Sequence, residues 1–121
     1  RVCIGSFSDR RIVVMRGALG PRLATSLGPR GVGRLVSASL AGRRAPLTPA
    51  VAAQVPVRYG RIPVVTPRLL ATAHASGMEV HVWTIDEPAE MRRLLDLGVD
   101  AIMTDRPDLL RDVLIARGAW V

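Results

Sequence analysis

The last third of the chain alternates between two kinds of apolar pattern, and this alternation constrains the fold more than any other feature. Residues 79–85 and 100–104 are short, nearly continuous apolar runs, which are typical of strands covered on both faces. Each run is followed within a few residues by apolar side chains at helical spacing, over residues 87–97 and 107–114. Strands joined by such short helical connections run parallel, with right-handed crossovers. The sequence therefore predicts an α/β fold.

The same rhythm extends towards the start of the chain. Strands are expected over residues 2–7 and, from a weaker pattern, 22–27. Helices are expected over about residues 10–19, 33–40 and 67–76. Helix starts are indicated by Ser8 with Asp9 and by Thr66 before Pro67, and helix ends by Gly77 and Gly98.

Two stretches rich in glycine or proline interrupt this rhythm. GPRGVG, residues 28–33, is interpreted as a glycine-rich turn, and no Lys-Ser or Lys-Thr follows its glycines as it does in a phosphate-binding loop. Pro56, Pro63 and Pro67 argue against a central strand for the whole of residues 52–67. We expect a hairpin-like excursion at the rim of the domain instead.

The charge of the chain is distributed unevenly. Residues 1–78 contain twelve arginines and one acid, Asp9, whereas residues 79–121 contain five arginines and nine acids. A basic half can indicate nucleic-acid binding, but there are no interleaved aromatic residues for base stacking and no zinc-ligand spacing. We expect an arginine-rich solvated surface and no nucleic-acid partner.

Cys3 is the only cysteine of the chain, so no internal disulfide can form. Its apolar neighbours favour a buried, inert thiol, and the composition fits a cytoplasmic protein. No apolar run is long enough for a transmembrane segment. The sequence opens directly in a strand, RVCIGSF, and we interpret the chain as a fragment of a longer protein.

Candidate site residues stand where the predicted strands end, because ligands of parallel α/β folds bind beyond the carboxyl ends of the strands. Trp83 is the strongest candidate, since a fully internal indole needs a partner for its N–H. Ser6 and Phe7 end the first strand. Asp86 and Asp105 also follow strands, but each is most simply a helix N-cap.

The remaining titratable residues do not form a recognisable catalytic or metal-binding pattern. His74 is expected at the surface, and His81 shares a strand face with Trp83 and is expected to be a satisfied interior histidine. Carboxylates are absent between Asp9 and Glu79, so no clustered pair is available. From the residues alone we assign no catalytic residue and no metal ligand.

VHVWTIDEPAEMRRLLDLGVDAIMTDRPDLL, residues 80–110, resembles the C-terminal signature of the glycerophosphodiester phosphodiesterase family. That signature has a Trp-Thr strand, a short helix, Gly-Val-Asp-Gly-Ile and Thr-Asp-Arg-Pro. IGSF at residues 4–7 resembles the family's mid-barrel Ser-Phe strand, and VTPRLLATAHASGMEV resembles the helix before the tryptophan strand. Ala101 is a mild departure, since the family commonly has glycine there.

The resemblance implies a (β/α)₈ barrel, of which residues 1–121 would be about the C-terminal half, a partial phosphodiesterase domain. It implies hydrolysis of small glycerophosphodiesters to an alcohol and glycerol 3-phosphate. The family's divalent cation, Mg²⁺ or Ca²⁺, and its His-Arg-Gly strand belong to the N-terminal half, so we expect the chain alone to bind no cation and to be inactive. Trp83, and less firmly Phe7 and Ser6, would line the substrate pocket.

Two other interpretations stay open. A half-barrel remnant would expose two strand edges and an apolar inner face, and so could act as a binding or self-associating module. An α/β enzyme with another chemistry is disfavoured, because neither a glycine fingerprint nor a nucleophile elbow is present.

Overall fold

The computed structural model describes residues 2–121, and they form the α/β fold that the sequence predicts. The strands that run parallel follow one another in space in the order of the chain, β1-β2-β3-β6-β7. A single bridge between Ser26 and Ala52 joins β2 to β3. The parallel strands are β1 (Cys3–Ile4), β2 (Ala24–Thr25), β3 (Ala52–Pro56), β6 (Glu79–Trp83) and β7 (Ala101–Ile102).

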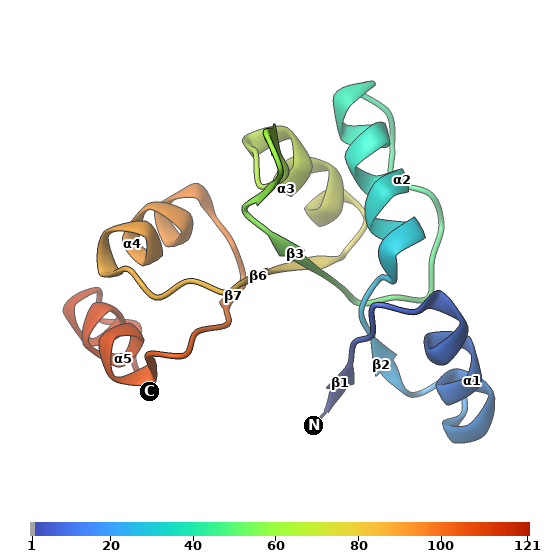
Figure 1. Ribbon diagram of the computed structural model, residues 1–121, viewed down its shortest axis with the longest axis horizontal. Helices are drawn as coiled ribbons and strands as arrows, with labels where there is room; N and C mark the ends of the chain where they lie inside the picture. Colours follow the sequence, from blue (N-terminus) through green and yellow to red (C-terminus); the bar gives the residue numbers. More distant parts are fainter. Residues whose placement is uncertain (1) are drawn as a thin grey trace.

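Helices alternate with these strands and lie on one side of them. They are α1 (Asp9–Leu19), α2 (Pro29–Leu40), α3 (Pro67–Ala75), α4 (Pro88–Leu97) and α5 (Pro107–Ala116). Figure 1 shows them along the outside of an arc, with the strands along its inside. Strands in chain order with all crossovers on one face are the arrangement of a barrel wall, in which a curved sheet carries helices only outside.

Alternate side chains of β6 explain how this wall is held together. Val80 and Val82 are fully buried beneath the helices, whereas His81 and Trp83 lie half-buried on the other face. The largest buried side chains of the core between sheet and helices are aliphatic: Leu35, Leu69, Met91, Leu94 and Val55. Burial of each stabilises the fold by about 1.5–3 kcal/mol, so the convex side of the sheet is the stable one.

Residues 52–56 correct the prediction for the proline-rich segment. They form β3, which pairs with β6 from Ala52 opposite Glu79 to Pro56 opposite Trp83. Ala53 and Val55 are fully buried. Pro56 is tolerated because it lies beyond the bridge that joins β3 to β2 at Ala52, so it pairs with β6 only and stands at an edge of the sheet. The excursion itself is confirmed, but it is shorter: β4 (Arg58–Tyr59) and β5 (Ile62–Pro63) form an antiparallel hairpin.

The glycine-rich turn predicted at residues 28–33 is wrong in its extent. Helix α2 begins at Pro29, with Gly28 at its N-cap. Proline is well suited to the first helical position because its φ is already helical and its missing N–H has no acceptor there. The two following glycines therefore lie inside the helix, and the connection from β2 is shorter than expected.

The N-caps predicted at Ser8 and Thr66 are confirmed, whereas those predicted at Asp86 and Asp105 are wrong. Ser8 and Thr66 accept hydrogen bonds from the backbone N–H groups of Arg11 and Leu69, at 3.5 and 3.1 Å. Helices α4 and α5 instead have Glu87 and Arg106 at their N-caps, and neither uses its side chain as a cap. A proline fills the first turn of both helices, so fewer N–H groups need an acceptor.

No helix within residues 2–121 combines the length and the apolar character that crossing a bilayer requires.

Candidate functional site

Phe7 and Trp83, both predicted site residues, come together at the carboxyl ends of β1 and β6. Their ring centroids lie 5.7 Å apart and the ring planes meet at 84°, an edge-to-face contact. In the sheet, β2 and β3 separate the two strands, so a flat sheet would hold them about 14 Å apart. The contact is made across the concave side of the wall, and it needs the curvature of the sheet.

This aromatic pair is open to solvent. Phe7 is 84% exposed, and Trp83 is half-buried with its side chain on the concave face. The peptide bond between Trp83 and Thr84 is cis. An edge-to-face pair contributes about 0.5–1.5 kcal/mol beyond its burial, so the two rings can hold each other in place while offering free aromatic faces to a ligand.

Ser6, the third predicted site residue, lies beside this pair in sequence but takes a local role. Its hydroxyl oxygen accepts a hydrogen bond from the backbone N–H of Ser8 at 3.1 Å. That contact supports the turn into α1, as in other short serine turns.

Gln54 is a candidate that the sequence reasoning missed, because residues 52–56 were not recognised as a strand. It stands on the concave face of β3, in register with His81 of β6. A Cβ atom added at Gly5 would collide with the side-chain amide oxygen of Gln54 and would lie 2.9 Å from the Ser26 hydroxyl oxygen. Gly5, Ser26 and Gln54 therefore meet below the aromatic pair. The pattern Ala-Ala-Gln-Val, with one polar residue between buried ones, was the signal for this position.

The concave face carries polar groups beside its aromatic and small apolar ones, so it is less apolar than the half-barrel interpretation expected. His81 is only 14% exposed at its side chain, and its Nε2 lies 2.8 Å from a carboxylate oxygen of Glu79. The prediction of a satisfied interior histidine is confirmed. Together with Gln54 and Ser26, this pair gives the floor of the site several hydrogen-bonding groups.

Asp100 makes its contacts at the amino end of the strands, opposite the end that carries the aromatic pair. One of its carboxylate oxygens accepts from the backbone N–H of Val80 at 2.8 Å and lies 2.7 Å from Nε2 of His74. Burial alone would raise the pKa of Asp100, but these two contacts outweigh it and hold that pKa below its ordinary value. His74 is exposed, as predicted.

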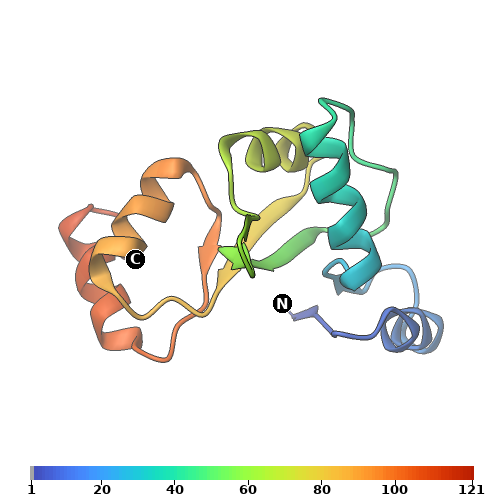
Figure 2. The same ribbon diagram turned by 45° about the horizontal axis from the view of Figure 1, so that its top comes forward.

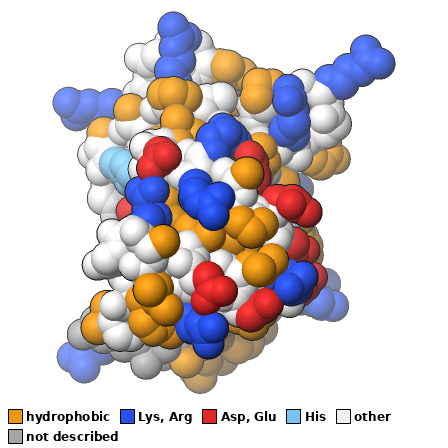
Figure 3. Space-filling model, turned by 90° about the vertical axis from the view of Figure 1, so that its left-hand side faces the viewer, with side chains coloured by type: hydrophobic (Ala, Val, Ile, Leu, Met, Phe, Trp, Pro, Cys, Tyr) orange, Lys and Arg blue, Asp and Glu red, His pale blue; other side chains and the backbone are white. Residues whose placement is uncertain are grey.

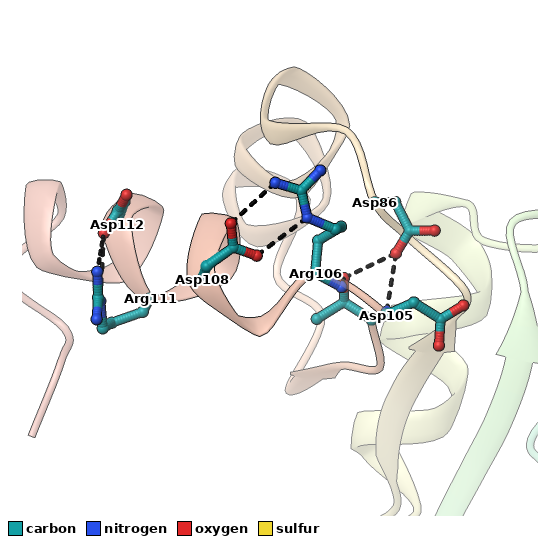
Figure 4. A network of polar contacts seen from close by, with 7 residues as sticks. Asp86, Asp105, Arg106, Asp108, Arg111 and Asp112 are labelled. Carbon is teal, nitrogen blue, oxygen red and sulfur yellow. Dashed lines mark hydrogen bonds and ion pairs between the residues drawn. The ribbon is translucent and has the colours of Figure 1, made fainter.

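Asp86 links the two loops that follow β6 and β7, instead of capping α4 (Figure 4). Its Oδ1 accepts from the Thr104 hydroxyl and from the backbone N–H of Asp105, both at 2.9 Å. Thr104 in turn accepts from the backbone N–H of Arg106 at 2.9 Å. The loop that begins directly after Trp83 is thus tied to the next loop of the wall.

Four of the nine acids in residues 79–121 pair with arginine. Glu90 pairs with Arg93 at 2.6 Å, and Asp96 with Arg117 at 2.6 Å. Asp108 receives two hydrogen bonds from Arg106. Figure 3, which faces the side of α4 and α5, shows acidic and arginine side chains interspersed with apolar ones. This surface is balanced in charge and presents no open carboxylate cluster.

The residues present do not fit a divalent cation. Within residues 2–121, no group of three or more His, Cys, Asp or Glu side chains is placed to hold a metal. Cys3 is no ligand candidate either, because burial and the nearby charge of Glu79 raise its pKa above the ordinary value. We assign no chemical step of this chain to a metal.

Comparison with known proteins identifies the family of the chain. The model of the glycerophosphoryl diester phosphodiesterase family matches residues 8–109. A probable glycerophosphodiester phosphodiesterase of Mycobacterium tuberculosis is 47% identical over 124 residues, which cover 99% of this chain and 47% of that protein. The human lysophospholipase D named GDPD1 is 45% identical over 40 residues, 33% of this chain and 13% of that protein.

Solved structures agree in fold. A putative glycerophosphoryl diester phosphodiesterase from Silicibacter pomeroyi matches with a TM-score of 0.73 and 29% identity, over 99% of this chain and 39% of that one. A phosphodiesterase from Oleispira antarctica, solved with the product sn-glycerol-3-phosphate, matches with a TM-score of 0.67 and 17% identity, over 93% and 41%. The chain spans less than half the length of these relatives.

Proposed function

This chain belongs to the glycerophosphoryl diester phosphodiesterase family, and we propose that it is the C-terminal part of an enzyme that hydrolyses glycerophosphodiesters to an alcohol and glycerol 3-phosphate. Residues 1–121 would then be a partial phosphodiesterase domain. The alcohol can vary without changing this reaction class, because the bond that breaks is between phosphorus and the oxygen of the alcohol.

Support for a partial barrel comes from the strand order. Parallel strands in chain order, helices on the outside only and a curved sheet are features of a (β/α)₈ barrel, which closes with eight strands. Within residues 2–121, β1 and β7 are each paired on one side only. Strands from a preceding segment would close the wall between these two edges.

The contact between Phe7 and Trp83 is the observation that carries the proposed role of this chain. It places two aromatic rings above a polar floor at the carboxyl ends of the strands, where barrel enzymes bind their substrates. The rings would cover the carbon skeleton of the substrate, while Gln54 and His81 offer hydrogen bonds. The chain would bind and orient the substrate, and catalytic groups and any divalent cation would be supplied from outside it.

Substitution of Trp83 tests this role in the full-length protein. Trp83→Ala is expected to lower kcat/KM for release of glycerol 3-phosphate from glycerophosphocholine about tenfold, the effect of losing about 1.4 kcal/mol of binding. Divalent-cation binding, measured by titration calorimetry, should not change. Trp120→Ala is the matched control, since Trp120 is exposed near the C-terminus. Equal kinetics for Trp83→Ala and Trp120→Ala would remove Trp83 from the site.

A non-catalytic, self-associating module is the second candidate. Exposed apolar side chains on α1, at Val13 and Val14, favour it, together with the open edges of β1 and β7. Sizing and thermal melting of the isolated chain would decide, and a soluble dimer that melts cooperatively would support this candidate.

A further inference from the structure

The hairpin formed by β4 and β5 projects where β3 ends, and its tip is exposed throughout. The five residues of the tip are Arg58-Tyr59-Gly60-Arg61-Ile62, and they combine two cations with an aromatic and an aliphatic side chain. Tyr59 is 76% exposed and Ile62 55% exposed. Figure 2 shows the hairpin, in green, between the end of β3 and the start of α3. Burial within residues 2–121 therefore does not account for its apolar side chains.

Further arginines lie at the same end of the sheet. In a parallel fold the first turn of each helix follows the carboxyl end of the preceding strand. The first turns of α1, α2 and α3 carry Arg10, Arg11, Arg30 and Arg68 against one acid, Asp9, whereas those of α4 and α5 carry Glu90 and Asp108. Cations at helix N-termini oppose the helix dipole, so they do not serve helix stability. The ion pairs found within residues 2–121 leave all four of them, and both hairpin arginines, without a carboxylate partner.

A surface of this kind matches the interface of an anionic bilayer. Arginines near such a surface are attracted to its negative charge, each by about 1 kcal/mol. Tyrosine favours the headgroup level, where its ring is in apolar surroundings and its hydroxyl in water. A soluble anion would be attracted by the arginines but would give no reason for exposed Tyr59 and Ile62. The rings of Phe7 and Trp83 lie at the same end of the strands.

We propose that the β4–β5 hairpin docks this protein onto an anionic phospholipid surface, with the carboxyl ends of β1, β2 and β3 facing the lipid and the acidic ends of β6 and β7 turned away from it. The hairpin would insert Tyr59 and Ile62 at the headgroup level, while the arginines of the hairpin and of the first helical turns contact lipid phosphates. This docking needs no catalysis and is separate from the proposed hydrolysis.

Vesicle binding by the full-length protein tests the proposal. Co-sedimentation is measured with vesicles of phosphatidylcholine alone and of phosphatidylcholine with phosphatidylglycerol. We expect binding only to the anionic vesicles, weakened about thirtyfold by Arg58→Gln with Arg61→Gln, since each arginine contributes about fivefold. Tyr59→Ser should also weaken binding.

Arg43→Gln with Arg44→Gln is the matched control. It removes the same charge from two exposed arginines in the connection between α2 and β3, which leads to the amino end of that strand. Binding within twofold of the unsubstituted protein is expected. An equal loss for both double variants would show adsorption by net charge and overturn the proposal, as would the absence of binding to anionic vesicles.

Two further measurements separate the alternatives. Binding of duplex DNA that depends on Arg58 and Arg61, without vesicle binding, would identify nucleic acid as the partner and refute a lipid surface. Hydrolysis of soluble glycerophosphocholine, assayed on the same samples, should be unaffected by the hairpin substitutions. A protein that docks without hydrolysing refutes only the proposed enzyme, and one that hydrolyses without docking refutes only the hairpin's role.

Discussion

Removal of the Asp86 carboxylate should loosen the loop that follows Trp83. Asp86→Ala deletes the acceptor of two hydrogen bonds, from the Thr104 hydroxyl and the Asp105 N–H. Hydrogen bonds to charged groups contribute about 1.5–3 kcal/mol, and less where water can replace the lost partner. Because Asp86 is half-buried and Asp105 exposed, we take about 1 kcal/mol for each bond. The free energy of unfolding should fall by about 2 kcal/mol.

Urea unfolding of the full-length protein measures this loss, and a double-mutant cycle assigns it. Asp86→Asn keeps an oxygen acceptor and should cost less than half as much. Thr104→Val combined with Asp86→Ala should give a coupling energy of about 1 kcal/mol. Asp112→Ala is the control, because it removes an exposed ion pair with Arg111 and should cost under about 0.5 kcal/mol.

Kinetics report whether the linked loops also position Trp83. We expect Asp86→Ala to lower kcat/KM for glycerophosphocholine severalfold, and Asp112→Ala to leave it unchanged. Equal stability of the Asp86→Ala and Asp112→Ala variants, or a coupling energy near zero, would refute the assignment of Asp86 as the link between the two loops.

Two further predictions concern acid stability and the glycines of α2. The pKa of Asp100 is lower in the folded protein than its ordinary value of 3.8, so its stabilising contribution is complete above that pH and is lost as the pH falls through the folded pKa. Urea unfolding across this acid range should show that Asp100→Asn flattens the decline, and an unchanged slope would contradict the role of its contacts. Gly33→Ala should stabilise by about 0.5–1 kcal/mol, because nothing lies within 4 Å of the added methyl group in the helix. Gly28→Ala should destabilise the protein by about 1–3 kcal/mol, because its methyl group would lie 3.2 Å from the Asp9 Cα. Thermal melting of the Gly28→Ala and Gly33→Ala variants tests both packing arguments, and melting temperatures that shift in the same direction would count against them.

Local chemistry explains which parts of the fold the sequence predicted. The caps at Ser8 and Thr66, and the left-handed glycines Gly77 and Gly98, act within one helical turn of their own position. Alternating buried and half-buried residues in β6 follow from the period of a strand. The short helical connections between the strands then favour a parallel α/β arrangement.

Predictions failed where one local signal competed with a tertiary one. Pro56 suggested that its segment could not join the ladder, yet the burial of Ala53 and Val55 between sheet and helices favours a strand up to that proline. Asp86 has the residue type of an N-cap, but its carboxylate accepts hydrogen bonds from the next loop, from the Thr104 hydroxyl and the Asp105 N–H. Thr104 and Asp105 are 18 and 19 residues from Asp86, so residue spacing along the helix does not predict either of them as a partner.

By itself, the sequence determined the α/β class, the order of the helices, all the parallel strands except β3, and the family resemblance, because these depend on residue patterns a few positions long. The tertiary structure decided that Phe7 meets Trp83, that Gln54 lies below them, and that Asp86 joins two loops. These contacts connect residues far apart in the chain, and they depend on the curvature and register of the sheet. All the helices lie on the convex face of this curved sheet, and no short stretch of sequence specifies that arrangement.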